Sequence, residues 1–275
     1  KVKVDGSEVF SQLKFIHSAV DPVDRNTIYV GSVSSGSFIT ATVIGDGSVI
    51  ESHAVVKKWA RIGEKARIGH HSVLGGDPQH LDFDSSTESF LTLGNQVRIG
   101  EGVTIHRSLY KGQTTNVGNE SFLMGNSHVA HDSILGDRVI LANGALLGGH
   151  VEVGDDTFVG GGAAVHQFVR IGPGVMVGGL AEISKDVGPH LLVMGRNRAC
   201  GLNRVGLKRR NVSKQDINVL KRFFRELLTR PVKVKSLAEK LMEHIDEESS
   251  ETIREFLEFF VSGQRGFARS QKKVD

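Results

Sequence analysis

The chain has 275 residues, enough for one large domain or two smaller ones, and it contains 33 glycines but only 5 prolines. Its formal net charge is +3 although the pI is about 9.0, so the composition does not indicate a general nucleic-acid-binding protein. The single cysteine, Cys200, excludes an intrachain disulfide and favours a reducing compartment. No apolar run approaches the roughly 20 residues that span a membrane.

A six-residue repeat organises the first two thirds of the chain. Residues 1–30 are loosely patterned, and we expect an entry strand and an irregular first coil there. From Phe38 to Leu74 an apolar residue recurs at every sixth position. This period fits neither a helix nor a flat strand, but it fits a triangular prism with one short strand and one turn per six residues. The sequence therefore predicts a parallel β-helix, an all-β solenoid in which residues eighteen apart stack.

The repeat is interrupted twice and then runs unbroken. The polar segment 77–92 carries no repeat and is expected to loop out of the prism. The register resumes at Ile99 and Ile105 but meets Lys111 at the next slot, which predicts a second excursion at 110–116. Twelve aliphatic residues then follow at perfect spacing: Val117, Leu123, Val129, Leu135, Leu141, Leu147, Val153, Val159, Val165, Ile171, Val177 and Ile183. The slots add up to about seven or eight coils of eighteen residues.

The last third of the chain has helical periodicity. Gly188-Pro189 is expected to end the prism, giving a β-helix over 1–189 and a C-terminal helical domain over 190–275. Ser213 is the expected N-cap of a first helix that stops before Pro231. A second helix is expected from Ser236, and a third over 251–262 with Gly263 after it. These three helices would cover the open end of the solenoid.

Three histidines align on one side of the predicted prism. The slots Lys111, Val129, Leu147 and Val165 are eighteen apart, and His131, His150 and His166 follow the last three. Gly148 and Gly149 lie between them and expose N–H groups that suit an oxyanion, and Asp132 is placed to orient His131. Solvated polar corners are an equally good interpretation of any one of these histidines. A zinc site formed by His106, His128 and His131 across a subunit boundary is a third.

Five short motifs resemble the UDP-N-acetylglucosamine O-acyltransferase family of lipid A synthesis. They are I-H-R at 105–107, N-S-H-V-A-H-D at 126–132, A-V-H-Q-F at 164–168, V-M-V-G-G at 175–179 and G-L-K-R-R at 206–210. The match is collinear from about Phe15 to Arg269. The resemblance implies a left-handed β-helix, a homotrimer, and transfer of an (R)-3-hydroxyacyl group from acyl carrier protein to the 3-hydroxyl of UDP-N-acetylglucosamine, without cofactor or metal.

The resemblance also assigns roles to individual residues. His131 matches the general base, Asp132 the residue that orients it, and the Gly149 N–H the oxyanion donor. Gly179 matches the residue that sets acyl length, and a glycine there leaves room for about fourteen carbons. His80 and Asp82 stand where the family often has an Asp and a Lys, and Val205 replaces an acidic nucleotide contact. The remaining matches are substrate and nucleotide contacts, namely His106, His128, His150, His166, Gln167, Asn203, Arg209 and Arg210.

Location and rival functions complete the expectations. The sequence is similar to that of plant members of the family, which lie behind a cleaved mitochondrial targeting segment. The missing initial Met agrees with such a segment. It would agree equally with a truncated protein of the bacterial cytoplasm. The rivals are the N-acyltransferase of the same pathway, a zinc-dependent hydratase of the carbonic anhydrase type, and a non-catalytic prism. The cations at 206–210 with Lys221, Arg222 and Arg225 suit a diphosphate or an acidic carrier protein.

Overall fold

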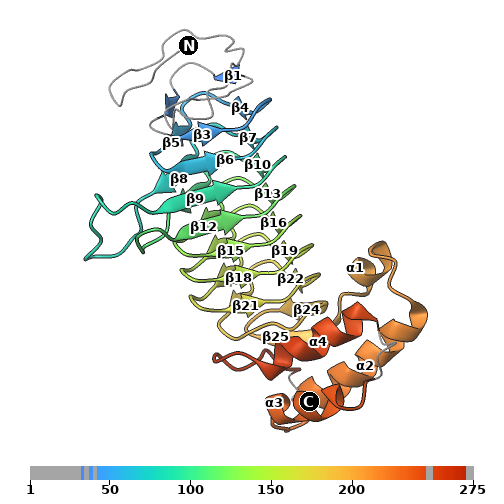
Figure 1. Ribbon diagram of the computed structural model, residues 1–275. Helices are drawn as coiled ribbons and strands as arrows, with labels where there is room; N and C mark the ends of the chain where they lie inside the picture. Colours follow the sequence, from blue (N-terminus) through green and yellow to red (C-terminus); the bar gives the residue numbers. More distant parts are fainter. Residues whose placement is uncertain (1–31, 34–36, 40–41, 246–249, 271–275) are drawn as a thin grey trace.

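A computed structural model describes residues 32–33, 37–39, 42–245 and 250–270. The chain winds into a long prism of stacked short strands, and helices pack at the end opposite β1 (Figure 1). The entry strand expected within 1–30 lies outside the described residues. No helix in the described part of the chain has the length and apolar character that crossing a membrane requires.

Three parallel sheets form the faces of the prism, and we name them A, B and C. Sheet A contains β1 (Ser32–Val33), β4 (Val49–Ile50), β7 (Arg67–Ile68), β10 (Arg98–Ile99), β13 (Phe122–Leu123), β16 (Ile140–Leu141), β19 (Phe158–Val159), β22 (Met176–Val177), β24 (Leu191–Met194) and the antiparallel β25 (Arg198–Leu202). Sheet B contains β2 (Phe38–Ile39), β5 (Val55–Val56), β8 (Val73–Gly76), β11 (Thr104–His106), β14 (His128–Val129), β17 (Leu146–Leu147), β20 (Ala164–Val165) and β23 (Glu182–Ile183). Sheet C contains β3 (Val43–Ile44), β6 (Ala60–Ile62), β9 (Phe90–Leu93), β12 (Thr114–Val117), β15 (Ile134–Leu135), β18 (Glu152–Val153) and β21 (Arg170–Ile171).

The core of the prism confirms the predicted repeat. All twelve aliphatic residues from Val117 to Ile183 are buried, and partners eighteen apart stack, as Val129 does on Leu147. A second row, two positions before each aliphatic slot, is also buried and was not predicted. It holds small residues, and the hydroxyls of Ser121, Ser133 and Thr157 bond to carbonyls of the next coil, as Ser133 Oγ does to Gly148 O at 3.1 Å. Small side chains therefore let three sheets meet around one narrow core.

Four details of the predicted register are wrong. The first excursion covers 77–89, because Phe90 already opens β9. The second covers 107–113, because Thr114 opens β12, and the slot above Val129 is therefore Ile105 rather than Lys111. Ile39, rather than Phe38, pairs with Val56, so that coil has seventeen residues. The prism also continues past Pro189, since β24 pairs in parallel with β22.

Among the described residues after the last strand there are four helices, one more than expected: α1 (Arg204–Arg209), α2 (Lys214–Leu228), α3 (Val234–Met242) and α4 (Glu251–Val261). Ser213 caps α2 as predicted, its side chain accepting the Asp216 N–H at 3.0 Å. The unpredicted α1 is formed by the basic G-L-K-R-R string, and α3 begins two residues before Ser236. A Cβ on Gly188 would lie 2.1 Å from Phe260, so α4 packs directly on the end of the prism.

The turns between sheets stack into three edges. The B–C edge carries residues 130–133, 148–151 and 166–169, the A–B edge carries 142–145, 160–163 and 178–181, and the C–A edge carries 136–139, 154–157 and 172–175. Successive turns are joined by backbone hydrogen bonds, as His150 N–H donates to His131 O at 3.0 Å. Function therefore depends on which edge each candidate residue occupies.

Candidate active site

Both excursions emerge beside the B–C edge and are fastened to one another by Arg107. This side chain is 1% exposed, and its guanidinium donates to Asp77 Oδ1 at 3.1 Å, Ser85 O at 2.9 Å and the Thr87 carbonyl. It also lies over two aromatic rings, those of Trp59 and Phe83. The 77–89 excursion is thus fixed to the residue that begins the 107–113 excursion.

His131 and Asp132 form a hydrogen-bonded pair on the B–C edge. His131 Nδ1 lies 2.8 Å from Asp132 Oδ2, and the side chains are 15% and 9% exposed. The carboxylate also accepts the Leu109 N–H at 3.1 Å and the Ser108 hydroxyl, both from the second excursion. Because an ionised carboxylate only accepts hydrogen bonds, Nδ1 carries the proton and Nε2 remains a proton acceptor.

The charge on Asp132 is secured by its donors. Burial raises the pKa of this carboxyl, but the hydrogen bonds from His131, Ser108 and Leu109 together outweigh burial and hold the pKa below its usual value. The backbone at Asp132 has φ 59°, a left-handed conformation that non-glycine residues rarely adopt, and its N–H donates to Thr115 Oγ1 at 2.8 Å. The turn therefore aims the carboxylate at the His131 ring and keeps it ionised.

Gly149 lies against the face of the His131 imidazole. A Cβ built on Gly149 would lie 2.8 Å from His131 Cε1 and 2.9 Å from Nε2, closer than any side chain allows. The N–H groups of Gly148 and His150 donate to the carbonyls of Val165 and His131. Within the described chain the Gly149 N–H has no acceptor, whereas the equivalent N–H groups of Asn119 and Asp137 on the C–A edge donate to side chains. Because Gly149 lies against the His131 ring, its unpaired N–H is a candidate donor to a developing oxyanion.

Three further histidines lie close to the pair. The His150 ring meets the His131 ring at 5.2 Å and stacks on Phe168 at 4.5 Å, and His150 Nε2 is 3.9 Å from Asp132 Oδ2. His128 Nδ1 is 2.7 Å from Thr104 Oγ1, and its ring contacts His106 edge-on at 5.0 Å. Burial lowers the pKa of His128 and His150, and burial with the neighbouring His128 lowers that of His106 to about 4. These rings are neutral at physiological pH.

The other expected substrate residues are more exposed. His166 Nδ1 lies 2.8 Å from Arg265 Nη2 instead of completing a stack with His131 and His150, and Gln167 beside it is exposed. His80 and Asp82 sit on the exposed tip of the first excursion, where the Asp82 N–H donates to His80 Nδ1 at 3.3 Å. The structure thus brings two of the three aligned histidines together and leaves the third on the same edge, facing the C-terminal segment.

The expected nucleotide residues occupy a different edge. Asn203 caps α1 through Gly206 N–H and donates to Gly174 O at 3.0 Å, which ties the helix to the C–A edge. Arg210 Nη1 is 3.2 Å from His190 Nδ1, and its Nε is 4.0 Å from Asp156 on the same edge. Arg209 is exposed, and in the described chain it has no hydrogen-bond or ion-pair partner. Gly179 is exposed and lies on the remaining edge, A–B. A Cβ built on Gly179 would lie 3.3 Å from Gly161 O.

The described residues offer one cluster whose ligand atoms could converge on a metal ion, namely His131, Asp132 and His150. It differs from the zinc trio His106, His128 and His131 considered from the sequence. Its Nδ1 and Oδ2 atoms are already 2.8 Å apart in a hydrogen bond. A metal would have to remove the proton between them and compete with the Ser108 and Leu109 donors, so the geometry fits a proton-transfer pair better.

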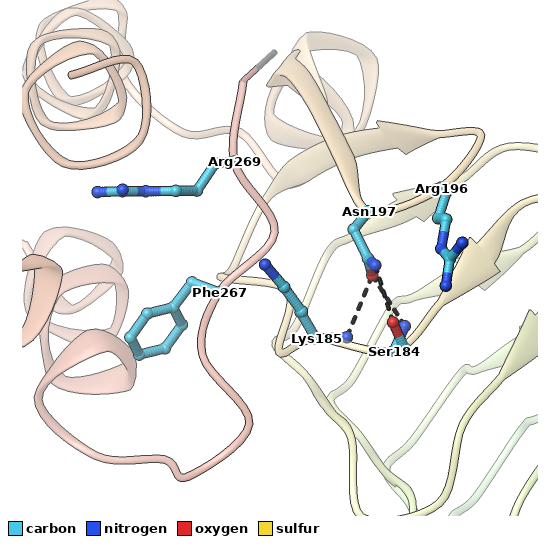
Figure 2. A pocket seen from close by; sticks show the side chains of 6 residues that line it. All are labelled: Ser184, Lys185, Arg196, Asn197, Phe267 and Arg269. Carbon is cyan, nitrogen blue, oxygen red and sulfur yellow. Dashed lines mark hydrogen bonds between the residues drawn. The ribbon is translucent and has the colours of Figure 1, made fainter. Parts of the chain in front are cut away.

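A separate cavity of about 370 Å³ lies at the junction of the last coil and the C-terminal segment (Figure 2). Asn197 accepts the backbone N–H groups of Ser184 and Lys185 at 2.8 and 3.1 Å, and Arg269 Nη2 donates to Val232 O at 2.7 Å. These side-chain bonds therefore act within the last coil and within the C-terminal part, and the backbone bond from Ala199 N–H to Arg269 O at 3.0 Å joins the two. Its lining comprises Ser184, Lys185, Arg196, Asn197, Phe267 and Arg269.

Known proteins share this architecture. Residues 186–268 match the family model for domain 2 of UDP-N-acetylglucosamine O-acyltransferase, and 41–76 and 114–149 match bacterial transferase hexapeptide repeats. A UDP-N-acetylglucosamine acyltransferase from Campylobacter jejuni is 31% identical, with 89% of this chain and 98% of that chain covered and a TM-score of 0.79. The chain belongs to the UDP-N-acetylglucosamine O-acyltransferase family.

Two further acyltransferase structures agree with this membership. The Bacteroides fragilis protein is 30% identical over 94% of this chain and 100% of that chain, with a TM-score of 0.83. The Arabidopsis protein is 30% identical over 88% of this chain and 92% of that chain, with a TM-score of 0.78. The match covers both the prism and the helical end of this family member.

Sequence reasoning overlooked four residues of the site. Arg107 and Phe168 were noted only as parts of motifs, and Ser108 and Thr115 were given no role. Ser108 bonds to Asp132 across the second excursion, Thr115 bonds to Asp132 from β12, and Phe168 stacks on His150 eighteen residues before it. Phe168 falls into one column with Asp132 and His150, each three residues after a slot of the unbroken run and all with left-handed φ. That column was the available signal.

Proposed function

We propose that this chain transfers an (R)-3-hydroxyacyl group from acyl carrier protein to the 3-hydroxyl of UDP-N-acetylglucosamine, the first step of lipid A synthesis. The observation that carries the proposal is the His131–Asp132 pair, which leaves Nε2 as an acceptor next to Gly149, a residue whose N–H has no acceptor in the described chain. A base and an oxyanion donor at one point are what acyl transfer requires. Family membership supplies the substrate class.

The geometry supports a direct transfer. The sugar hydroxyl oxygen attacks the thioester carbonyl carbon while His131 Nε2 takes the hydroxyl proton. The carbonyl oxygen becomes an oxyanion that accepts the Gly149 N–H, and Asp132 stabilises the imidazolium through Nδ1. The tetrahedral intermediate then breaks its C–S bond, and the imidazolium returns the proton to the departing thiolate. Atoms and charges balance without any further group.

The three-edge arrangement supports a homotrimer as the working unit. His131 lies on the B–C edge, Gly179 on the A–B edge, and Arg210, at the end of α1, beside the C–A edge, so one chain cannot present all of them to one substrate molecule. A site between copies, with the base from one prism and the nucleotide and acyl contacts from others, resolves this. Mixing two inactive proteins, His131→Ala and the double variant Arg209→Ala/Arg210→Ala, should restore activity. No recovery after subunit exchange would contradict the shared site.

The remaining assignments follow from placement. His106, His128, His150, His166 and Gln167 would line the sugar and acyl site along the B–C edge, and His80 and Asp82 would approach it from the first excursion. Asn203 would act by holding α1, which presents the unpartnered Arg209 to the UDP diphosphate. The cations of α2 would receive the acidic carrier protein.

Localisation and domain organisation are also part of the proposal. We place the protein in mitochondria, supported by its resemblance to plant members, with a bacterial cytoplasm as the alternative. Fractionation of cells that express a tagged precursor tests this. We further propose that the prism and the helical part are two domains, with the boundary after β24 and β25 rather than between 189 and 190, which limited proteolysis tests.

The activity is tested with radiolabelled UDP-N-acetylglucosamine and a series of 3-hydroxyacyl carrier proteins. The expected product carries the acyl group on the 3-oxygen, located by NMR, and forms with donors near fourteen carbons. A parallel assay offers a UDP-glucosamine acceptor with a free 2-amine, and acylation of that amine in place of the 3-hydroxyl of UDP-N-acetylglucosamine would support the N-acyltransferase of the pathway. Absence of product with every donor would overturn the proposal, and bound zinc with hydratase activity would favour the carbonic anhydrase alternative.

A further inference from the structure

The hydroxyl of Ser108 completes the hydrogen-bonded chain that begins at His131. Ser108 is fully buried and lies in the second excursion, one residue after Arg107. Its Oγ contacts Asp132 Oδ1, on the opposite side of the carboxylate from the His131 contact at Oδ2. Three side chains from two separate coils, Ser108, Asp132 and His131, therefore form one line.

The direction of the Ser108 hydrogen bond is fixed by its surroundings. The Tyr110 N–H donates to Ser108 Oγ at 3.0 Å, which occupies a lone pair of the hydroxyl oxygen. The hydroxyl hydrogen has two acceptors in reach, Asp132 Oδ1 at short range and Tyr110 O at 3.4 Å, and the carboxylate is nearer and charged. Ser108 is therefore a donor to Asp132 Oδ1, and the other carboxylate oxygen, Oδ2, faces His131 Nδ1.

The excursion that carries Ser108 is itself held in place. Ser108 N–H donates to Phe90 O at 3.1 Å, Ser89 Oγ donates to Ser108 O at 2.5 Å, and Gly112 N–H donates to Glu88 O at 2.8 Å. Arg107 fastens the same point to the first excursion. The hydroxyl thus has little freedom to turn away, and the two excursions hold Asp132 as one unit.

From this geometry we infer that Ser108 is a positioning residue for the acyl transfer, which acts by holding Asp132 against the His131 imidazole. The inference rests on the proposed function. A hydrogen bond to a charged group is among the stronger contacts in a protein, so Ser108→Ala should lower kcat by about 10-fold or more. The KM for UDP-N-acetylglucosamine should change little, because Ser108 is buried and does not face the substrate.

The decisive experiment is a double-mutant cycle with Asp132→Asn. If Ser108 acts through Asp132, Ser108→Ala should cost much less in the Asp132→Asn background than in the wild type, and Ser108→Thr, which keeps the hydroxyl, should recover most of the lost kcat. Equal losses in both backgrounds, or a Ser108→Ala enzyme with normal kcat, would overturn the inference. Ser108→Gly is the second variant without a hydroxyl if Ser108→Ala fails to fold.

A measurement without turnover separates this inference from the proposed function. In protein labelled with ¹⁵N-histidine, the His131 Nδ1–H bonded to Asp132 should give a downfield proton signal. That signal should be lost in His131→Ala and Asp132→Asn, and it should shift or broaden in Ser108→Ala. An unchanged signal in Ser108→Ala would overturn the positioning role whether or not acyl transfer is observed. A shifted signal in a protein without acyl transfer would leave the role intact and overturn only the reaction.

Discussion

Gly149→Ala is the substitution that tests the geometry of the site most finely. The new Cβ would lie 2.8 Å from His131 Cε1 and 2.9 Å from Nε2, whereas ordinary contact begins near 3.4 Å. The imidazole must therefore move by roughly half an ångström or more, although Asp132 holds its other side at 2.8 Å. Misplacing a catalytic group by about 1 Å can cost about 100-fold in rate, so we expect kcat to fall by about 10- to 100-fold.

Gly125→Ala is the matched control for this prediction. Gly125 occupies the same turn position on the A–B edge, and its notional Cβ meets first the flexible Asn143 amide at 3.2 Å. Neither Gly149 nor Gly125 has a positive φ, so alanine strains neither backbone. The assay is steady-state acyl transfer with thermal unfolding measured in parallel. If Gly149→Ala retained activity within about twofold of Gly125→Ala, the placement of His131 over Gly149 would be wrong.

Four further predictions follow from particular contacts. Arg107→Met removes the donors that hold both excursions and should lower the free energy of unfolding by about 3 kcal/mol, measured by chemical denaturation against Arg98→Met on the exposed face. Between pH 6.5 and about 4, His106 binds a proton in the unfolded chain but not in the folded one. The free energy of unfolding should therefore fall on acidification through this window, by at most about 1.4 kcal/mol per pH unit. His106→Gln should reduce this dependence of the unfolding free energy on pH. Acyl transfer should survive saturating chelator, and loss of activity that added zinc restores would support the metal site. Gly179→Met, which narrows the A–B edge beside Gly161, should shift the preferred donor to shorter chains, and an unchanged donor profile would argue against its role.

The repeat made most of the prism predictable from sequence. Each aliphatic slot had to point inward, and all twelve slots from Val117 to Ile183 are buried as expected, although the row of small residues two positions before them was not predicted. The C-terminal helices were also accessible, because Ser213 and the spacing of Ile217, Leu220 and Leu227 are local signals. Helix α1 was missed because six residues are too few for an amphipathic period, and its cap depends on Asn203 reaching Gly174 on the prism.

The site was only partly predictable because its most informative contacts cross the two excursions. An insertion of unknown length disrupts the alignment of residues eighteen positions apart. Lys111 was therefore predicted to stack on Val129, whereas Ile105 does so. The hydrogen bonds from Ser108 to Asp132 and from Arg107 to Asp77 and Ser89 join residues 18 to 30 positions apart. They involve irregular segments of backbone, so the six-residue repeat does not predict them. By contrast, His131 and Asp132 are neighbours in sequence and follow a regular strand, so their pairing could be expected.

The measurement that tests the central claim most directly is the single-turnover rate of His131→Ala. The variant would be saturated with UDP-N-acetylglucosamine and 3-hydroxyacyl carrier protein in the presence of chelator, and its fold would be checked by circular dichroism and oligomer size. With His131 as the only base, we expect the rate of acyl transfer to fall by about 100-fold or more while both substrates still bind. A folded His131→Ala protein that transfers the acyl group at nearly the wild-type rate would contradict this account of the active site.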